Sequence, residues 1–222
     1  KIIGLCRKLA PHRVEKERPV RAMIMGIPNV GKSTIINILA NRIIAKVGNE
    51  PAVTKRQQRI DLDDGVVLFD TPGILWPKIE NQNSSYRLAI TGAIKDTVLE
   101  YDDIAFYAMD YLKKYYESNL YDKFKLEPLE ANQFNPEQGE EETLFLLETI
   151  GKQRGCLMSG GHVDLDKVCK ILINQYRTAG LGSISLETPS MIEAELIEVV
   201  KAAKLKEEKE ALRKKKGKRK KR

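Results

Sequence analysis

The sequence predicts an α/β domain at the start of the chain, a small all-α domain after it, and a basic tail at the end. Two apolar runs, residues 21–25 and 65–69, are typical of buried strands, and helical spacing over residues 33–40 follows the first of them. Helical periodicity then recurs between residues 102 and 179. We therefore divide the chain into residues 1–98, 99–200 and 201–222.

The segment between the first strand and its helix carries a phosphate-binding motif. Residues 26–33 read Gly-Ile-Pro-Asn-Val-Gly-Lys-Ser, which matches GxxxxGK[ST]. In this motif the glycines let the backbone approach phosphate oxygens, the helix N-terminus supplies partial positive charge, and the lysine reaches the outer phosphates. The alternative is a Gly-rich turn that contains Gly-Lys-Ser by chance. The expected nucleotide-binding residues are Asn29, Val30, Gly31, Lys32, Ser33, Thr34 and Gly73.

A second motif favours GTP. Residues 70–73 read Asp-Thr-Pro-Gly directly after the second strand, and DxxG in this place is the GTPase form of the magnesium-sensing switch. We expect Asp70 to hold Mg²⁺ through water, Ser33 to offer its hydroxyl to the ion, and the Gly73 N–H to contact the terminal phosphate. Thr54, in the polar segment between the motifs, is the candidate magnesium ligand of the first switch. An ordinary exposed loop threonine is the alternative.

The motif with which GTPases read guanine, NKxD, does not occur in residues 1–222. The nearest string, Ile94-Lys95-Asp96, lacks both the asparagine and the spacing. The chain begins at Lys1 within what looks like the end of a helix, so we expect that its start has been cut off. An ATPase is disfavoured by Asp-Thr-Pro-Gly but stays open, because the base-reading residues lie outside this sequence.

Five segments together resemble the YlqF/RbgA family, the circularly permuted ribosome biogenesis GTPases. They span roughly residues 20–191 and are 26–34, 51–58, 70–78, 91–96 and 154–161. In that family NKxD precedes the phosphate loop, so the missing start accounts for its absence here. The sequence departs from the family at Ala52, where glycine is usual. The resemblance therefore does not determine the backbone path of the first switch.

The resemblance implies a Ras-like GTPase domain followed by a helical domain, with GTP and Mg²⁺ as cofactors. It also implies a role in late assembly of the large ribosomal subunit in the bacterial cytoplasm, with that subunit and its rRNA as partners, and we expect a monomer. The family's proposed catalytic histidine lies upstream, so neither His12 nor His162 inherits that role and the catalytic residue stays unknown. A GTPase switch that acts on a protein client, with a tail not directed to RNA, is the alternative function.

Two residues beside the motifs bear on hydrolysis. Ile74 stands where Ras-type enzymes place the glutamine that orients the attacking water, so another group has to do this. Asn29 resembles the phosphate-loop asparagine that helps bind K⁺ in cation-stimulated GTPases, where the ion neutralises developing charge. A plain loop-capping asparagine is the alternative.

The rest of the chain predicts three helices, over residues 102–116, 140–152 and 165–179, with Asp164 as the N-cap of the third. The sequence has no apolar run of about 18 residues, which excludes a helical membrane span. No signal peptide is visible, although a cut start would hide one. The cysteines are too few and scattered for a zinc site or a disulfide framework, so we interpret them as packing residues in a reducing cytosol. They are Cys6, Cys156 and Cys169.

Positive charge is concentrated at the end of the chain. Residues 201–222 contain ten Lys and three Arg against three Glu, a net charge of +10, while the whole chain carries +7. Their low apolar content predicts disorder until the segment meets a polyanion, most simply rRNA; a tail that serves only solubility is the alternative. The third predicted helix carries a basic stripe. We interpret this stripe either as a surface that lies along an RNA backbone or as an ordinary solvated face of the helix. The RNA-binding candidates are Lys167, Lys170, Arg177, Lys214, Lys215, Lys216, Lys218 and Arg219.

Overall fold

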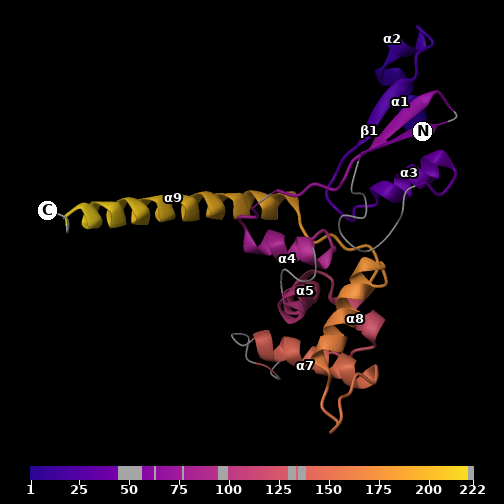
Figure 1. Ribbon diagram of the computed structural model, residues 1–222. Coiled ribbons are helices and arrows are strands. Elements are labelled where there is room, and N and C mark those ends of the chain that lie inside the picture. Colours follow the sequence, from indigo (N-terminus) through magenta and orange to yellow (C-terminus); the bar gives the residue numbers. More distant parts are fainter. Residues whose placement is uncertain are drawn as a thin grey trace.

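The computed structural model describes residues 1–44, 57–62, 64–76, 78–94, 100–129, 134 and 139–219, with side chains as far as residue 209. Both helices and strands occur up to residue 70, and only helices follow from residue 82 onward among the described elements (Figure 1). The elements are α1 Ile2–Leu9, α2 Pro11–Val14, β1 Val20–Ile24, α3 Lys32–Ala40, β2 Gln58–Leu62, β3 Val66–Asp70, α4 Gln82–Ile90, α5 Tyr101–Tyr115, α6 Glu117–Phe124, α7 Gly139–Gln153, α8 Leu165–Arg177 and α9 Pro189–Arg219.

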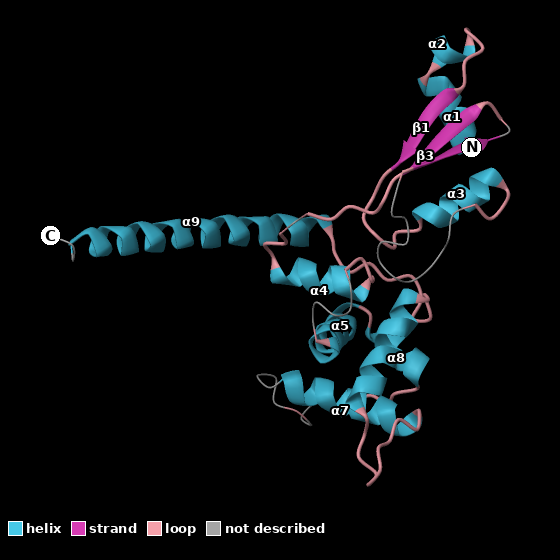
Figure 2. Ribbon diagram, in the orientation of Figure 1, coloured by secondary structure: helices cyan, strands magenta, loops and turns pink. Residues whose placement is uncertain are grey.

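The described strands form one sheet in the order β1-β3-β2 (Figure 2). β1 pairs with β3 in parallel, with Ile24 opposite Asp70, and β2 pairs with β3 in antiparallel orientation. The two predicted strands, at residues 21–25 and 65–69, correspond to β1 and β3. Because parallel strands end at the same edge of a sheet, the loops that follow β1 and β3 meet there.

The sheet has its own small core. Val66 and Leu68 of β3 pack with Ile36 of α3, and partly buried residues of α1 complete this cluster. In β2 the side chains alternate, with Ile60 and Leu62 buried and the residues between and before them exposed. This period of two is the pattern of a strand with one buried face, so residues 58–62 are ordered by the sheet although they end a polar segment.

The helical part of the chain has a second core, formed by α4 to α8. The three predicted helices correspond to α5, α7 and α8, and the Asp164 carboxylate accepts a hydrogen bond from the Lys167 N–H at 3.2 Å, as an N-cap should. The helical core begins before residue 99, because Ala89 and Ile90 of α4 are fully buried within it. By its packing α4 therefore belongs to the helical part, although in the sequence it closely follows the loop after β3.

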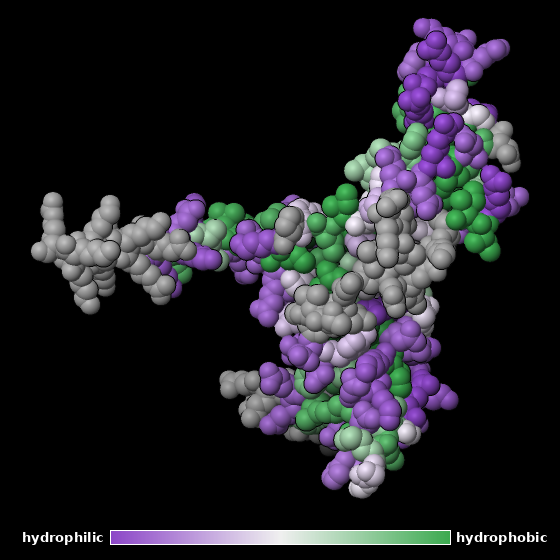
Figure 3. Space-filling view, in the orientation of Figure 1, coloured by the Kyte–Doolittle hydropathy of each residue, from purple (hydrophilic) through white to green (hydrophobic). Residues whose placement is uncertain are grey.

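The end of the chain differs from its sequence prediction. Residues 201–219, predicted as disordered, continue α9, which extends away from the body of the molecule (Figure 1). Low apolar content argues against a packed core but not against a helix, because Lys, Glu, Ala and Leu are strong helix formers. Apolar side chains also remain exposed on the part of α9 nearest the body, as Figure 3 shows.

The cysteines pack as predicted. Cys156 and Cys169 are buried and Cys6 is half-buried, all as free thiols. Burial raises the pKa of Cys169 to about 12, so this thiol stays protonated and unreactive at neutral pH. In the ranges that the structure describes, no helix combines the length and the apolar character that a bilayer span requires.

Candidate nucleotide-binding site

The phosphate loop connects β1 to α3. Gly31 is the N-cap of α3 in the left-handed conformation, with φ of 85°, and Asn29 also has a positive φ, of 59°. The loop delivers Lys32 and Ser33 into the first turn of a nine-residue helix, whose unpaired N–H groups and dipole favour an anion. The motif therefore has the strand, loop and helix context that the sequence predicts for it.

Lys32 points back into this loop rather than into solvent. Its Nζ donates hydrogen bonds to the carbonyl oxygens of Gly26, at 3.1 Å, and Ile27, at 2.6 Å. Burial lowers the pKa of Lys32, and the nearby charge of Asp70 opposes this shift. The ammonium group is thus held among neutral carbonyls beside a carboxylate. A phosphate oxygen that replaces one of these carbonyls makes a stronger, charge-assisted hydrogen bond.

The Asp-Thr-Pro-Gly loop lies directly against the phosphate loop. The Thr71 hydroxyl donates to the Ile24 carbonyl at 2.7 Å, and the Ile74 N–H donates to the Gly26 carbonyl at 3.3 Å. Gly73 approaches the backbone of Pro28 so closely that an added Cβ would lie 2.7 Å from its nitrogen. Only glycine fits this contact without displacing one loop, so the two loops move together or lose their contact.

The predicted magnesium ligands are placed in part. Ser33 is half-buried in the first turn of α3, and Asp70 is fully buried at the end of β3, opposite Ile24. A hydroxyl and a carboxylate are oxygen donors of the kind that Mg²⁺ prefers, so these residues fit the ion. Thr54 lies outside the described residues. No group of three or more His, Cys, Asp and Glu residues with metal-ligating geometry occurs in the part of the chain that the structure describes.

The remaining predicted nucleotide contacts belong to the same loop. Val30 and Thr34 are exposed, on either side of the N-cap of α3. Asn29 is bound to the helical part of the molecule, because its Nδ2 donates to the Gly92 carbonyl at 2.6 Å. This bond uses the amide nitrogen, whereas a K⁺ ion would be held by the oxygen.

The three basic residues predicted to form one stripe on α8 do not lie together in the structure. Lys167 and Lys170 are exposed and form ion pairs with Asp164, at 2.8 Å, and Asp166, at 2.6 Å. Arg177, at the end of α8, is half-buried and donates to backbone carbonyls of α4. Arg177 therefore does not share the exposed face of the two lysines. The side chains of the tail candidates, from Lys214 to Arg219, lie outside the described ones, and their backbone belongs to α9.

Sequence reasoning did not find the ion-pair network that joins α4 to α9. Arg87 of α4 is buried and bonded to Glu195 of α9, and its Nη1 also lies 3.4 Å from Glu187. The Nδ2 atoms of Asn81 and Asn83 donate to the same Glu195 carboxylate, each at 3.2 Å. These bonds hold the pKa of Glu195 below its usual value, with Arg87 as the main cause. No sequence motif marks this network, because its partners are about 100 residues apart.

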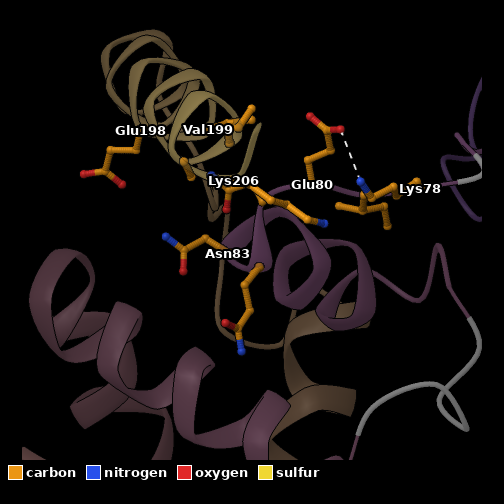
Figure 4. Close-up of a pocket in the computed structure, with 11 residues that line it drawn as sticks. Lys78, Glu80, Asn83, Glu198, Val199 and Lys206 are labelled. Carbon is orange, nitrogen blue, oxygen red and sulfur yellow. Dashed lines mark ion pairs between the residues drawn. The ribbon is translucent and has the colours of Figure 1, made fainter. Parts of the chain in front are cut away.

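A groove lies beside this network, between the residues that follow the second loop and α9 (Figure 4). On one side Lys78 and Glu80 form an exposed ion pair at 3.5 Å. On the other side α9 contributes Glu198, Val199 and Lys206. The long basic helix is therefore attached to the molecule at α4 and at the residues just before it.

The fold and the two loops define a phosphate-loop nucleotide-binding protein of the GTPase type. Residues 21–148 match the family model of the 50S ribosome-binding GTPases, and the chain belongs to this family. It is 45% identical to ribosome biogenesis GTPase A of Priestia megaterium, over 82% of this chain and 60% of the relative. It is 42% identical to the protein of the same name from Bacillus cereus, over 85% of this chain and 62% of the relative.

The chain thus spans about 60% of the length of the curated relatives that it matches. A solved GDP-bound structure of TM YlqF has a similar fold, with a TM-score of 0.50 and 24% sequence identity over 83% of this chain and 67% of that chain. The resemblance to the YlqF/RbgA family, predicted from five sequence segments, is confirmed by these relatives.

Proposed function

We propose that this chain is the phosphate-binding and switching part of a GTPase that acts in late assembly of the large ribosomal subunit. The observation that carries the proposal is the contact between the two loops, with Gly73 against Pro28 and the Ile74 N–H bonded to the Gly26 carbonyl. Because the Asp-Thr-Pro-Gly loop contacts the phosphate loop, its conformation can respond to the presence of the terminal phosphate. The family description, 50S ribosome-binding GTPase, supports the assignment to the large subunit, and the names of the relatives support a role in ribosome biogenesis.

Each residue of the site has a role in this proposal. Lys32 and the N–H groups at the start of α3 bind and orient the phosphates, and the Gly73 N–H contacts the terminal one. Ser33 and Asp70 hold Mg²⁺, Asp70 through water, and Thr54 joins them in the triphosphate state. When bound, the ion would neutralise negative charge on the outer phosphates. Asn29 contributes its oxygen to a K⁺ ion.

The proposal extends to the arrangement of the whole protein. We assign residues 1–98 to the C-terminal portion of a circularly permuted, Ras-like GTPase domain, residues 99–200 to a helical domain and residues 201–222 to a basic tail. By its packing, α4 belongs to the helical core although it lies before residue 99. The protein acts as a monomer in the cytoplasm. The rRNA contacts are assigned to Lys167 and Lys170 on α8 and to the tail, at Lys214, Lys215, Lys216, Lys218 and Arg219.

Hydrolysis by the isolated protein should be slow and should increase with purified large ribosomal subunits. Ile74 is exposed beside Gly73, and an isoleucine side chain cannot orient a water molecule, so a group from elsewhere has to complete the site. If Asn29 holds K⁺, turnover should also be faster in potassium than in sodium. Phosphate release at equal ionic strength, with and without subunits, measures both effects. Purified small subunits are the control, and fast hydrolysis that responds to neither large subunits nor potassium would contradict the proposal.

A further inference from the structure

A continuous series of contacts joins α8 to the phosphate loop. It begins at Arg177, the last residue of α8. Its guanidinium donates through Nη2 to the Ala89 carbonyl at 2.7 Å and through Nε to the Ile90 carbonyl at 3.0 Å. Both residues are fully buried in the last turn of α4, where the helix dipole favours a positive charge, and the Ala89 carbonyl also accepts a hydrogen bond from the Gly92 N–H at 2.9 Å. Arg177 thus fixes the C-terminal end of α4.

The next contact is at Gly92, two residues beyond the end of α4. Gly92 has a left-handed backbone, with φ of 72°, which glycine adopts more easily than other residues. A Cβ at this position would lie 3.2 Å from Nδ2 of Asn29 and 3.4 Å from Cζ of Arg177. Gly92 is therefore enclosed between a side chain of the phosphate loop and the guanidinium from α8.

The last contact reaches the nucleotide site itself. Asn29 has a positive φ, which is uncommon outside glycine, and its Nδ2 donates to the Gly92 carbonyl at 2.6 Å. This bond ties the phosphate loop to the segment that Arg177 fixes. A displacement of α8 along or about its axis would move the end of α4 and Gly92. It would thereby break the hydrogen bond that holds the Asn29 side chain.

We propose that Arg177 is a positioning residue for the nucleotide site, which acts through Gly92 on Asn29 and couples α8 to the phosphate loop. The proposal rests on the proposed GTPase function. Because α8 also carries the exposed Lys167 and Lys170, a polyanion bound to α8 can alter nucleotide affinity through this coupling, and nucleotide alters polyanion affinity by the same factor. Arg177 itself touches neither the nucleotide nor the polyanion.

A double-mutant cycle in the full-length protein tests the coupling. Arg177→Gln should weaken the affinity for fluorescent GDP by about three- to tenfold, which lies within the range of couplings carried by intervening residues. In an Asn29→Ala background the same substitution should have little further effect, because the hydrogen bond from Asn29 to Gly92 is already absent. Arg177→Lys should restore part of the affinity, since it keeps a positive donor at the end of α4 but not the two-pronged guanidinium. Arg59→Gln, which changes an exposed arginine of β2, is the matched control.

Gly92→Ala provides a second variant that leaves the Arg177 side chain in place. Its Cβ should separate Asn29 from Gly92 and weaken GDP binding severalfold, while the unfolding midpoint falls because alanine is strained at the positive φ of Gly92. Unchanged affinity in both Arg177→Gln and Gly92→Ala would overturn the proposal, as would effects of Arg177→Gln and Asn29→Ala that multiply fully in the double variant. A wild-type protein that does not bind GDP would instead overturn the proposed function.

Discussion

Replacing Lys32 with alanine should weaken the binding of GTP and GDP by about a hundredfold or more. The ammonium group is buried in the phosphate loop, and its loss leaves phosphate oxygens without their charged partner. A hydrogen bond to a charged group is worth about 1.5 to 3 kcal/mol, and Lys32 is expected to contact more than one phosphate. Titration with fluorescent nucleotides measures the loss.

Lys32→Ala should not unfold the protein, because Lys32 lies outside both hydrophobic clusters; the substitution removes the hydrogen bonds from Nζ to the Gly26 and Ile27 carbonyls and the positive charge that acts on Asp70. Circular dichroism of the variant tests this. Lys152→Ala is the matched control, since Lys152 is an exposed lysine of α7 with a single weak ion pair to Glu148 at 3.9 Å. Wild-type nucleotide affinity in Lys32→Ala would show that residues 26–33 are not the phosphate site.

Gly73→Ala should separate the Asp-Thr-Pro-Gly loop from the phosphate loop. The new methyl group would lie 2.7 to 2.9 Å from backbone and side-chain atoms of Pro28, and one of the loops has to shift to accommodate it. Overpacking of this kind costs about 1 to 3 kcal/mol. We expect the affinity for a non-hydrolysable GTP analogue to fall by about tenfold or more. GDP affinity should fall less, because the Gly73 N–H is expected to contact the terminal phosphate that GDP lacks.

The comparison of GTP-analogue affinity with GDP affinity is the decisive part of this experiment. Gly4→Ala is the matched control, because a Cβ at Gly4 meets no atom within 4 Å and the residue has no positive φ. Equal losses for the two nucleotides would indicate a general distortion of the phosphate loop. No loss for either would mean that the contact between Gly73 and Pro28 does not matter for the switch.

The parts of the site that were predicted from the sequence are those in which short segments determine both structure and chemistry. The phosphate loop and the Asp-Thr-Pro-Gly motif each follow a strand directly, so their place at one sheet edge follows from parallel pairing of β1 and β3. The N-cap role of Asp164 was also predictable, because a capping residue needs only its own first turn.

The parts that were not predicted depend on partners far away in the sequence. Arg177 has the same chemistry as Lys167 and Lys170, and only the packing of α8 against α4 separates it from the exposed stripe. The polar helix α4 is stabilised by its contacts with the helical core rather than by its own periodicity. β2 ends a polar segment, and its two buried positions are too few to identify a strand without its neighbour β3.

The affinity of the full-length protein for purified large ribosomal subunits, in two nucleotide states, tests the central claim most directly. If the two loops form a GTP switch that controls subunit binding, affinity with a non-hydrolysable GTP analogue should exceed affinity with GDP by about tenfold, within the usual range of allosteric coupling. Lys32→Ala should abolish this difference. Equal affinity in the two states, or no binding to large subunits in either, would contradict the account.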